Sequence, residues 1–224
     1  MEQKVTLYHG SSQVVQMPTY GMGKKNNDYG QSFYCTESLE LAKEWACTSV
    51  VGGYANHYEL ETKELKVLNL ADKHVLNWLA VLIANRTFEL KSNLALEARE
   101  YLIKEFLIDT TSYDVVIGYR ADDSYFAFAT GFVNGTISLE QLSRAMVLGK
   151  LGTQIVLKSK QAFCNIAFLG YEEVTQSQYY INRLSRDREA RNTYLKIRGE
   201  KSISESIYML DILRKGWKEN DICL

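Results

Sequence analysis

The chain has 224 residues, of which 46% are hydrophobic and 24% charged, and its formal net charge is -1. This length and composition favour one globular domain over residues 1–224, with a sizeable core. The near-neutral charge excludes a global field that would collect nucleic acid or anionic membrane. Four widely spaced cysteines, no CxxC or Cys/His cluster, no leader pattern and no apolar run of about 18 residues predict a reduced, cytoplasmic protein without structural zinc or a membrane span.

The N-terminal part of the chain holds the first candidate site. Alternating apolar residues predict a strand that ends at His9, Gly10 and Ser11. After a long loop rich in glycine, the chain returns as a second short strand that carries Tyr34. A histidine and an aromatic residue at paired strand ends, beside a glycine that lets a ligand touch the backbone, suit a small planar ligand attached to a sugar.

Apolar periodicity and turn residues predict the remaining elements. Thr36 is expected to cap a helix that carries Trp45. An unusually apolar segment near residues 73–84 is expected to be a buried helix, and the run 114–119 a central strand. The further expectations are strands at 57–60, 65–70, 154–158 and 164–168, helices at 94–107, 126–133 and 138–146, and a C-terminal helical extension over about 175–224 with helices at 175–196 and 202–217.

Several short motifs stand in a recognisable order. The first group is His9-Gly10-Ser11, Gly30-Gln31-Ser32-Phe33-Tyr34, Trp45 and Thr153-Gln154-Ile155-Val156. The second group is Asp28-Tyr29-Gly30, Leu41-Ala42-Lys43-Glu44-Trp45-Ala46, Gly118-Tyr119-Arg120-Ala121-Asp122-Asp123 and Arg186-Asp187-Arg188-Glu189-Ala190-Arg191. The first group resembles the His-Tyr-Glu class of ADP-ribosyltransferase folds. With the second, nearly the whole chain resembles the bacterial DUF3990 family of similar domains.

This resemblance implies both a fold and a reaction. The fold is an α+β domain in which two split antiparallel sheets form a cleft, with a helical insertion at about 73–107. The reaction is cleavage of the nicotinamide glycosidic bond of NAD, used as a co-substrate without a metal, followed by mono-ADP-ribosylation of a macromolecule. The resemblance makes His9, Tyr34 and Gln154 the catalytic triad.

The resemblance also assigns roles in holding NAD. His9 would hydrogen-bond a ribose hydroxyl, and Gly10, with Ser11 beside it, would offer its backbone to the nicotinamide amide. Tyr34 and Trp45 would sandwich the ring in an apolar slot. Bond cleavage creates a sugar oxocarbenium ion, so the site also needs an acceptor near the ribose where positive charge develops.

Most active members of the class carry a glutamate where this chain has Gln154. A glutamine can accept a ribose hydroxyl but brings no charge to the sugar cation, so chain elongation is expected to be lost. Mono-transfer, hydrolysis by an NAD glycohydrolase, and a non-catalytic module that binds NAD, ADP-ribose or a partner stay open as alternatives. Weaker substrate-binding candidates are Gly152, where arginine-specific relatives carry glutamate, and Asp122 and Asp123, which either lie at the cleft mouth or cap the next helix.

Partners follow from the resemblance and from one basic segment. A protein, RNA or DNA is the expected acceptor. An antitoxin protein is a further candidate, because a toxin or phage-defence setting suits the family, and no membrane partner is expected. Residues 183–201 carry seven basic and three acidic side chains. That segment is either a solvated helix face or a docking surface for RNA, DNA or an acidic partner.

Overall fold

The computed structural model describes residues 3–121, 123–148, 152–200 and 206–222. Strands and helices alternate irregularly along the chain, as expected of an α+β protein. The elements are β1 Lys4–Ser11, β2 Phe33–Cys35, α1 Leu39–Ala46, β3 Gly53–Glu61, β4 Val67–Asn69, α2 Val75–Asn85, α3 Asn93–Phe106, β5 Val115–Tyr119, α4 Asp123–Val133, α5 Leu139–Leu148, β6 Thr153–Leu157, α6 Lys160–Cys164, β7 Ile166–Val174, α7 Gln176–Gly199 and α8 Met209–Lys215, with 3₁₀ turns at Leu70–Asp72, Thr110–Ser112 and Glu219–Asp221.

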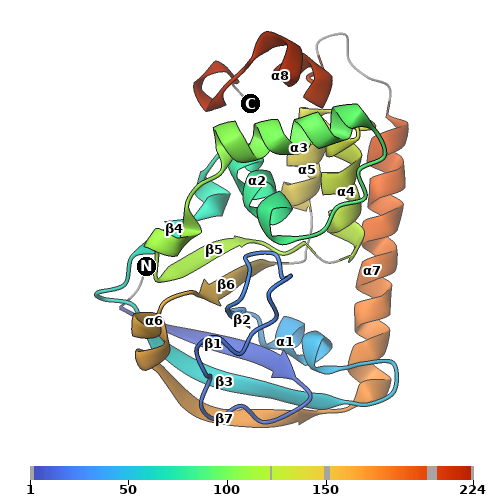
Figure 1. Cartoon of the computed structure of the whole chain (residues 1–224). Coiled ribbons are helices and arrows are strands. Elements are labelled where there is room, and N and C mark those ends of the chain that lie inside the picture. Colours follow the sequence, from blue (N-terminus) through green and yellow to red (C-terminus); the bar gives the residue numbers. More distant parts are fainter. Residues whose placement is uncertain (1–2, 122, 149–151, 201–205, 223–224) are drawn as a thin grey trace.

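The strands form two sheets (Figure 1). The first has the order β1-β3-β7 and is antiparallel throughout. The second has the order β2-β6-β5-β4, with antiparallel pairs except for β4 and β5, which run parallel. The prediction of two antiparallel sheets is therefore wrong for the second sheet, which is mixed. The reason is the predicted helical insertion itself, since α2 and α3 provide the long crossover that parallel neighbours require.

The main core lies between the second sheet and the helices above it in Figure 1. Helix α2 is buried over Leu76–Ile83, as its apolar sequence predicts, and packs against α3. A second core fills the space between the sheets, with Leu7 and Tyr58 from the first sheet and Ile155 and Leu157 from the second. The two sheets thus share a core near the strand ends that carry the candidate site.

Helix α7 runs along the side of the molecule, from the first sheet to the helical layer (Figure 1). It contacts α1, α4 and α5. Arg186 donates two hydrogen bonds of 2.9 and 2.8 Å to Glu44 of α1. The side-chain amide of Gln141 in α5 donates to the carbonyl of Ile197 at 2.6 Å. Helix α7 therefore links the two layers.

The start of α1 differs from the prediction. Ser38, and not Thr36, is the N-cap: its hydroxyl accepts a hydrogen bond from the Leu41 amide at 3.3 Å. Thr36 stays extended because its backbone exchanges hydrogen bonds of 2.8 and 2.9 Å with Tyr8 of β1. This isolated bridge ties β1 of the first sheet to the residue that follows β2 of the second.

Two later predictions are also wrong. Cys164 ends helix α6, which Ser159 caps, and β7 begins only at Ile166. Of the helix predicted at 202–217, residues 202–205 lie outside the described residues and 206–208 are not helical; α8 begins at Met209, where the side chain of Asp211 accepts from the Tyr208 backbone and caps the helix. The other predicted elements are present with shifted ends. Among the described residues, no helix is long and apolar enough to cross a membrane.

Candidate functional site

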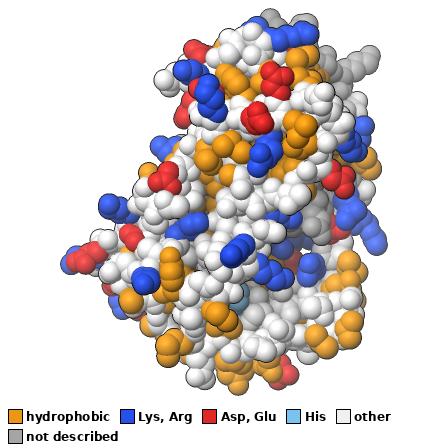
Figure 2. All heavy atoms as spheres, viewed as in Figure 1, with side chains coloured by type: hydrophobic (Ala, Val, Ile, Leu, Met, Phe, Trp, Pro, Cys, Tyr) orange, Lys and Arg blue, Asp and Glu red, His pale blue; other side chains and the backbone are white. Residues whose placement is uncertain are grey.

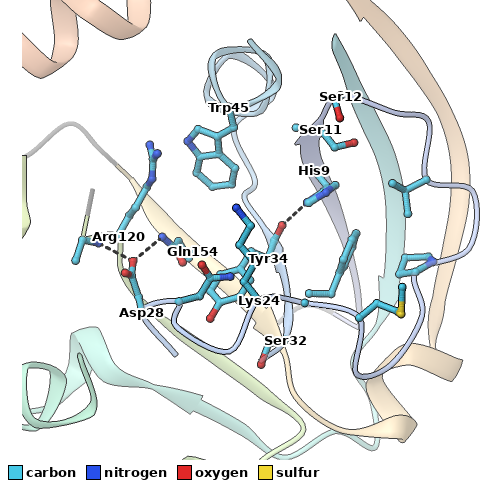
Figure 3. A pocket seen from close by; sticks show the side chains of 18 of the residues that line it. His9, Ser11, Ser12, Lys24, Asp28, Ser32, Tyr34, Trp45, Arg120 and Gln154 are labelled. Carbon is cyan, nitrogen blue, oxygen red and sulfur yellow. Dashed lines mark hydrogen bonds between the residues drawn. The ribbon is translucent and has the colours of Figure 1, made fainter. Parts of the chain in front are cut away.

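A cavity of about 730 Å³ opens where the two sheets meet (Figure 3). Ligand pockets commonly occupy about 300–1,000 Å³, so it has the size of a small-molecule site. Its walls come from β1, β2, β6, α1 and the loop between β1 and β2. His9, Tyr34 and Gln154, predicted as a triad, all line this cavity. The fold brings them together although they are far apart in the sequence.

His9 is fixed by a hydrogen bond between its Nδ1 and the carbonyl oxygen of Tyr34, at 2.7 Å. A carbonyl only accepts, so Nδ1 carries the proton and Nε2 of the neutral ring is left as an acceptor. Burial lowers the pKa of His9, and the Tyr34 hydrogen bond offsets this only in part. Neutral His9 therefore offers one nitrogen that can accept a hydroxyl proton.

Gly10 presents its backbone to the same cavity. The N–H and C=O groups of Tyr8 bond to Thr36, at the edge of β1 that faces away from β3. Backbone groups two residues apart on a strand point to the same edge, so the N–H and C=O groups of Gly10 also face away from β3. A side chain at Gly10 would also collide with the carbonyl of Ala42 in α1. The glycine thus allows α1, which carries Trp45, to lie against the strand end.

Tyr34 holds the loop that precedes it. Its hydroxyl donates to the Gly30 carbonyl at 2.6 Å and accepts from the Tyr29 amide at 3.1 Å. Burial raises the pKa of Tyr34 well above its ordinary range. The hydroxyl is therefore a neutral structural group, and the ring is the part of Tyr34 that can contact a ligand.

Asp28 lies beside Gln154 at the floor of the cavity (Figure 3). Only 5% of each residue is exposed. Asp28 Oδ1 accepts from Arg86 Nη1 at 2.7 Å, while Oδ2 accepts from the Ala121 amide at 2.9 Å and from Gln154 Nε2 at 3.1 Å. The carboxylate thereby joins the β1–β2 loop to the end of α2 and to the second sheet.

Three buried polar atoms of the lining have no hydrogen-bond partner among the described residues: Ser32 Oγ, Trp45 Nε1 and Gln154 Oε1. Buried polar atoms are nearly always paired, so unpaired ones on residues that line a cavity are candidate partners for a water or a polar ligand. The guanidinium of Arg120 lies 4.9 Å above the Trp45 ring, so a planar ligand would use the other face of that ring.

The rim of the cavity is positively charged. Lys24, Arg120 and Arg183 line it, in addition to Arg86, which is paired with Asp28. Figure 2 shows lysine and arginine side chains (blue) around a hollow on this face of the molecule. Asp28 is the single acidic residue of the described lining. Such a rim suits a ligand that carries phosphate groups.

The weaker candidates lie in different places. Ser11 lines the cavity, but its hydroxyl donates to Gln13 O at 2.5 Å and accepts from Asn56 Nδ2 at 3.1 Å. Gly152 has φ +71° and is exposed, outside the described lining of the cavity. Asp122 lies outside the described residues, and Asp123 begins α4. Among described residues, no cluster of three or more His, Cys, Asp or Glu could hold a metal.

The sequence alone did not indicate five polar residues as part of the site: Lys24, Asp28, Arg86, Arg120 and Arg183. Charged residues such as these are mostly found on the solvated surface of a protein, so the sequence alone does not distinguish them from ordinary surface residues. Asp28 and Arg120 lie in two of the motifs that carry the family resemblance, and Arg183 lies in the basic segment 183–201, but none of these patterns assigned them to the site. The burial of the Asp28 carboxylate depends on contacts that are distant in sequence.

Comparison with known proteins identifies the family. The DUF3990 model, described as a protein of unknown function, matches residues 5–168. No curated protein and no solved structure shows a significant match. The matched part contains His9, Tyr34 and Gln154 and leaves α7 outside. Because it is well over half of the sequence, the chain belongs to the DUF3990 family.

Proposed function

We propose that the chain is an NAD-dependent mono-ADP-ribosyltransferase that modifies a macromolecule. The observation that carries the proposal is the combination of a free histidine nitrogen, an open backbone edge and a cationic rim in one cavity, whose lining residues also include three with unpaired polar atoms. Each group matches one part of NAD. The resemblance of the motif order to ADP-ribosyltransferases supports the same assignment.

The nicotinamide end of NAD would enter between β1 and α1. The backbone N–H of Gly10 can donate to the oxygen of the nicotinamide carboxamide, and the backbone C=O of Gly10 can accept from its NH₂ group. The free face of Trp45 and the ring of Tyr34 supply apolar area for the ring. Nε2 of His9 would accept a ribose hydroxyl. The diphosphate would lie toward the cationic rim, where Arg120 and Arg183 could pair with it.

The reaction then needs little from the protein besides orientation and polarity. The bond between ribose C1′ and the nicotinamide nitrogen breaks, and its electron pair leaves with nicotinamide. The acceptor attacks C1′ and loses a proton to solvent, so ADP-ribosyl acceptor, nicotinamide and a proton are the products. Gln154 Oε1 would accept a ribose hydroxyl near the developing charge, with a weaker effect than that of a carboxylate.

The test is incubation of pure protein with NAD labelled in its adenylate half. Free nicotinamide and label on candidate protein, RNA and DNA are measured together. We expect both with the wild type, loss of both with His9→Ala, and little change with His57→Ala, a histidine of β3 outside the cavity lining. Transfer that survives His9→Ala would contradict the proposal.

Two other outcomes identify the alternative functions. Nicotinamide release without a labelled acceptor identifies an NAD glycohydrolase. NAD binding in calorimetry without turnover identifies a non-catalytic module.

A further inference from the structure

The contacts of Asp28 decide how the Gln154 amide is oriented. Asp28 Oδ2 lies 3.1 Å from the Gln154 side chain and also receives the Ala121 amide, while Oδ1 is occupied by Arg86. All three partners are donors, which suits a carboxylate. An amide oxygen turned toward Asp28 would face a negative oxygen, so the nitrogen must take this position.

Fixing the nitrogen leaves the carbonyl oxygen as the unused group of Gln154. This oxygen is itself buried and has no partner among the described residues, and Gln154, with 5% of its surface exposed, is one of the residues that line the cavity. Water or a ligand hydroxyl is the usual partner of such an atom. The direction of the amide is thus imposed by Asp28 and not by the strand that carries Gln154.

We propose that Asp28 is a positioning residue that holds the carbonyl oxygen of Gln154 toward the cavity, where it accepts a hydroxyl of the ligand's ribose. The identity of the ligand rests on the proposed function, whereas the orientation of the amide rests on contacts within the protein. Arg86 completes the arrangement, because it occupies Oδ1 and leaves Oδ2 for the amide.

This arrangement also offers a reason why a glutamine stands where the resemblance places the glutamate of most active ADP-ribosyltransferases. A carboxylate at position 154 would place two negative oxygens near the 3.1 Å that separates Gln154 from Asp28. Two carboxylates this close cannot both stay ionised without cost. A glutamine is the residue of the same length that matches Asp28, so Gln154→Glu alone is expected to lower stability and not to raise turnover.

The experiment compares four proteins: wild type, Asp28→Asn, Gln154→Glu and the double variant. Thermal midpoints are measured near neutral pH, with Asp114→Asn, a carboxylate that accepts from the Lys66 amide away from the cavity, as a matched control. We expect both single variants to be destabilised and the double variant to be less destabilised than their sum. If the two single variants lower the thermal midpoint additively in the double variant, Asp28 and Gln154 do not interact and the proposal is overturned.

A second readout follows the Gln154 amide directly. Its side-chain NH₂ signal in a ¹H-¹⁵N spectrum is assigned by its absence in Gln154→Glu. We expect Asp28→Asn to shift that signal and Asp114→Asn to leave it in place. An unchanged signal in Asp28→Asn would show that Asp28 does not hold the amide. If Asp28→Asn fails to fold, the stability of Gln154→Glu between acid and neutral pH tests the same contact, and equal stability to wild type throughout would overturn it.

Turnover separates this inference from the proposed function. If the wild type releases nicotinamide, Asp28→Asn should lower kcat by about 10-fold to 100-fold, the usual effect of losing a hydrogen bond to a charged group, with a much smaller change in KM. An unchanged kcat would overturn the positioning role. If the wild type releases none, the proposed function fails, and the stability cycle and the NH₂ signal still decide whether Asp28 orients Gln154.

Discussion

Asp28 and Glu44 are buried to nearly the same extent, with 5% and 4% exposed, yet their contacts differ. Both oxygens of Glu44 accept from Arg186, so that carboxylate is saturated and braces α1 against α7. Asp28 gives one oxygen to Arg86 and shares the other between a backbone amide and Gln154. The difference is that one oxygen of Asp28 accepts from Gln154, which lines the candidate site, whereas Arg186 is not part of that lining.

The largest expected effect is that of Asp28→Ala. The change leaves the Arg86 guanidinium, the Ala121 amide and the Gln154 amide without their acceptor. Breaking a buried pair from one side costs about 3–5 kcal/mol of unfolding free energy, which urea denaturation can measure. A loss no larger than that of Glu44→Ala would remove the distinction between the two carboxylates.

Gly10→Ala should have the next largest effect on stability. The substitution displaces α1, the helix that carries Glu44. The new methyl group would collide with backbone atoms of Ala42 and Ala46. Overpacking of this kind costs about 1–3 kcal/mol, and we expect weaker NAD binding as Trp45 moves with the helix. Gly199→Ala is the matched control, since a methyl group there meets nothing within 4 Å. Equal stability of the two variants in thermal denaturation would contradict this account.

Glu44→Gln should cost less than either change. Glutamine keeps a side-chain oxygen that can accept a hydrogen bond from Arg186, so the pair loses its charge but not every contact. A loss of about 1–2 kcal/mol is expected, with nicotinamide release at saturating NAD close to that of the wild type. A fall in kcat as large as that of Asp28→Asn would show that the Glu44 pair also acts on the reacting groups.

The smallest expected effect is the loss of stability that results when His9 is protonated in acid. Because burial lowers the pKa of folded His9 below the ordinary value of 6.5, its contribution to stability is present above that pH and is lost as pH falls through the folded pKa. Urea midpoints measured from neutral to acid pH should fall less steeply in His9→Gln than in His57→Gln. Burial also lowers the pKa of His74, so the slope is reduced and not abolished. Equal slopes would contradict the assignment.

The sequence predicted the parts of the site that depend on local pattern. His9 and Tyr34 lie at strand ends that alternation and turn residues indicate, and the order of motifs joined Gln154 to them. Asp28 was missed because its burial depends on Arg86 and Ala121, which are 58 and 93 positions away. No local pattern encodes such contacts, which exist only once the sheets and helices have packed.

The fold, like the site, was predictable where it depends on local sequence and not where it depends on contacts between distant residues. The apolar periodicity of α2 and the continuous apolar run of β5 predicted two buried elements. The parallel pairing of β4 with β5 was not predictable from either strand, because it depends on how the helices between them cross. The start of α1 was misplaced because the bridge between Tyr8 and Thr36 outweighs the capping tendency of a threonine.

The hydrogen bonds of Asp28 and Tyr29 also have a consequence for folding order. Asp28 bonds to Gln154 across 126 positions, and the carbonyl of Tyr29 accepts from Lys158 across 129. Contacts of such long sequence separation form late, because loop closure must come first. The floor of the cavity is therefore completed only when β6 docks. During synthesis, a nascent chain that has not yet released Lys158 lacks the oriented Gln154 amide, so the site can form only after β6 has emerged from the ribosome.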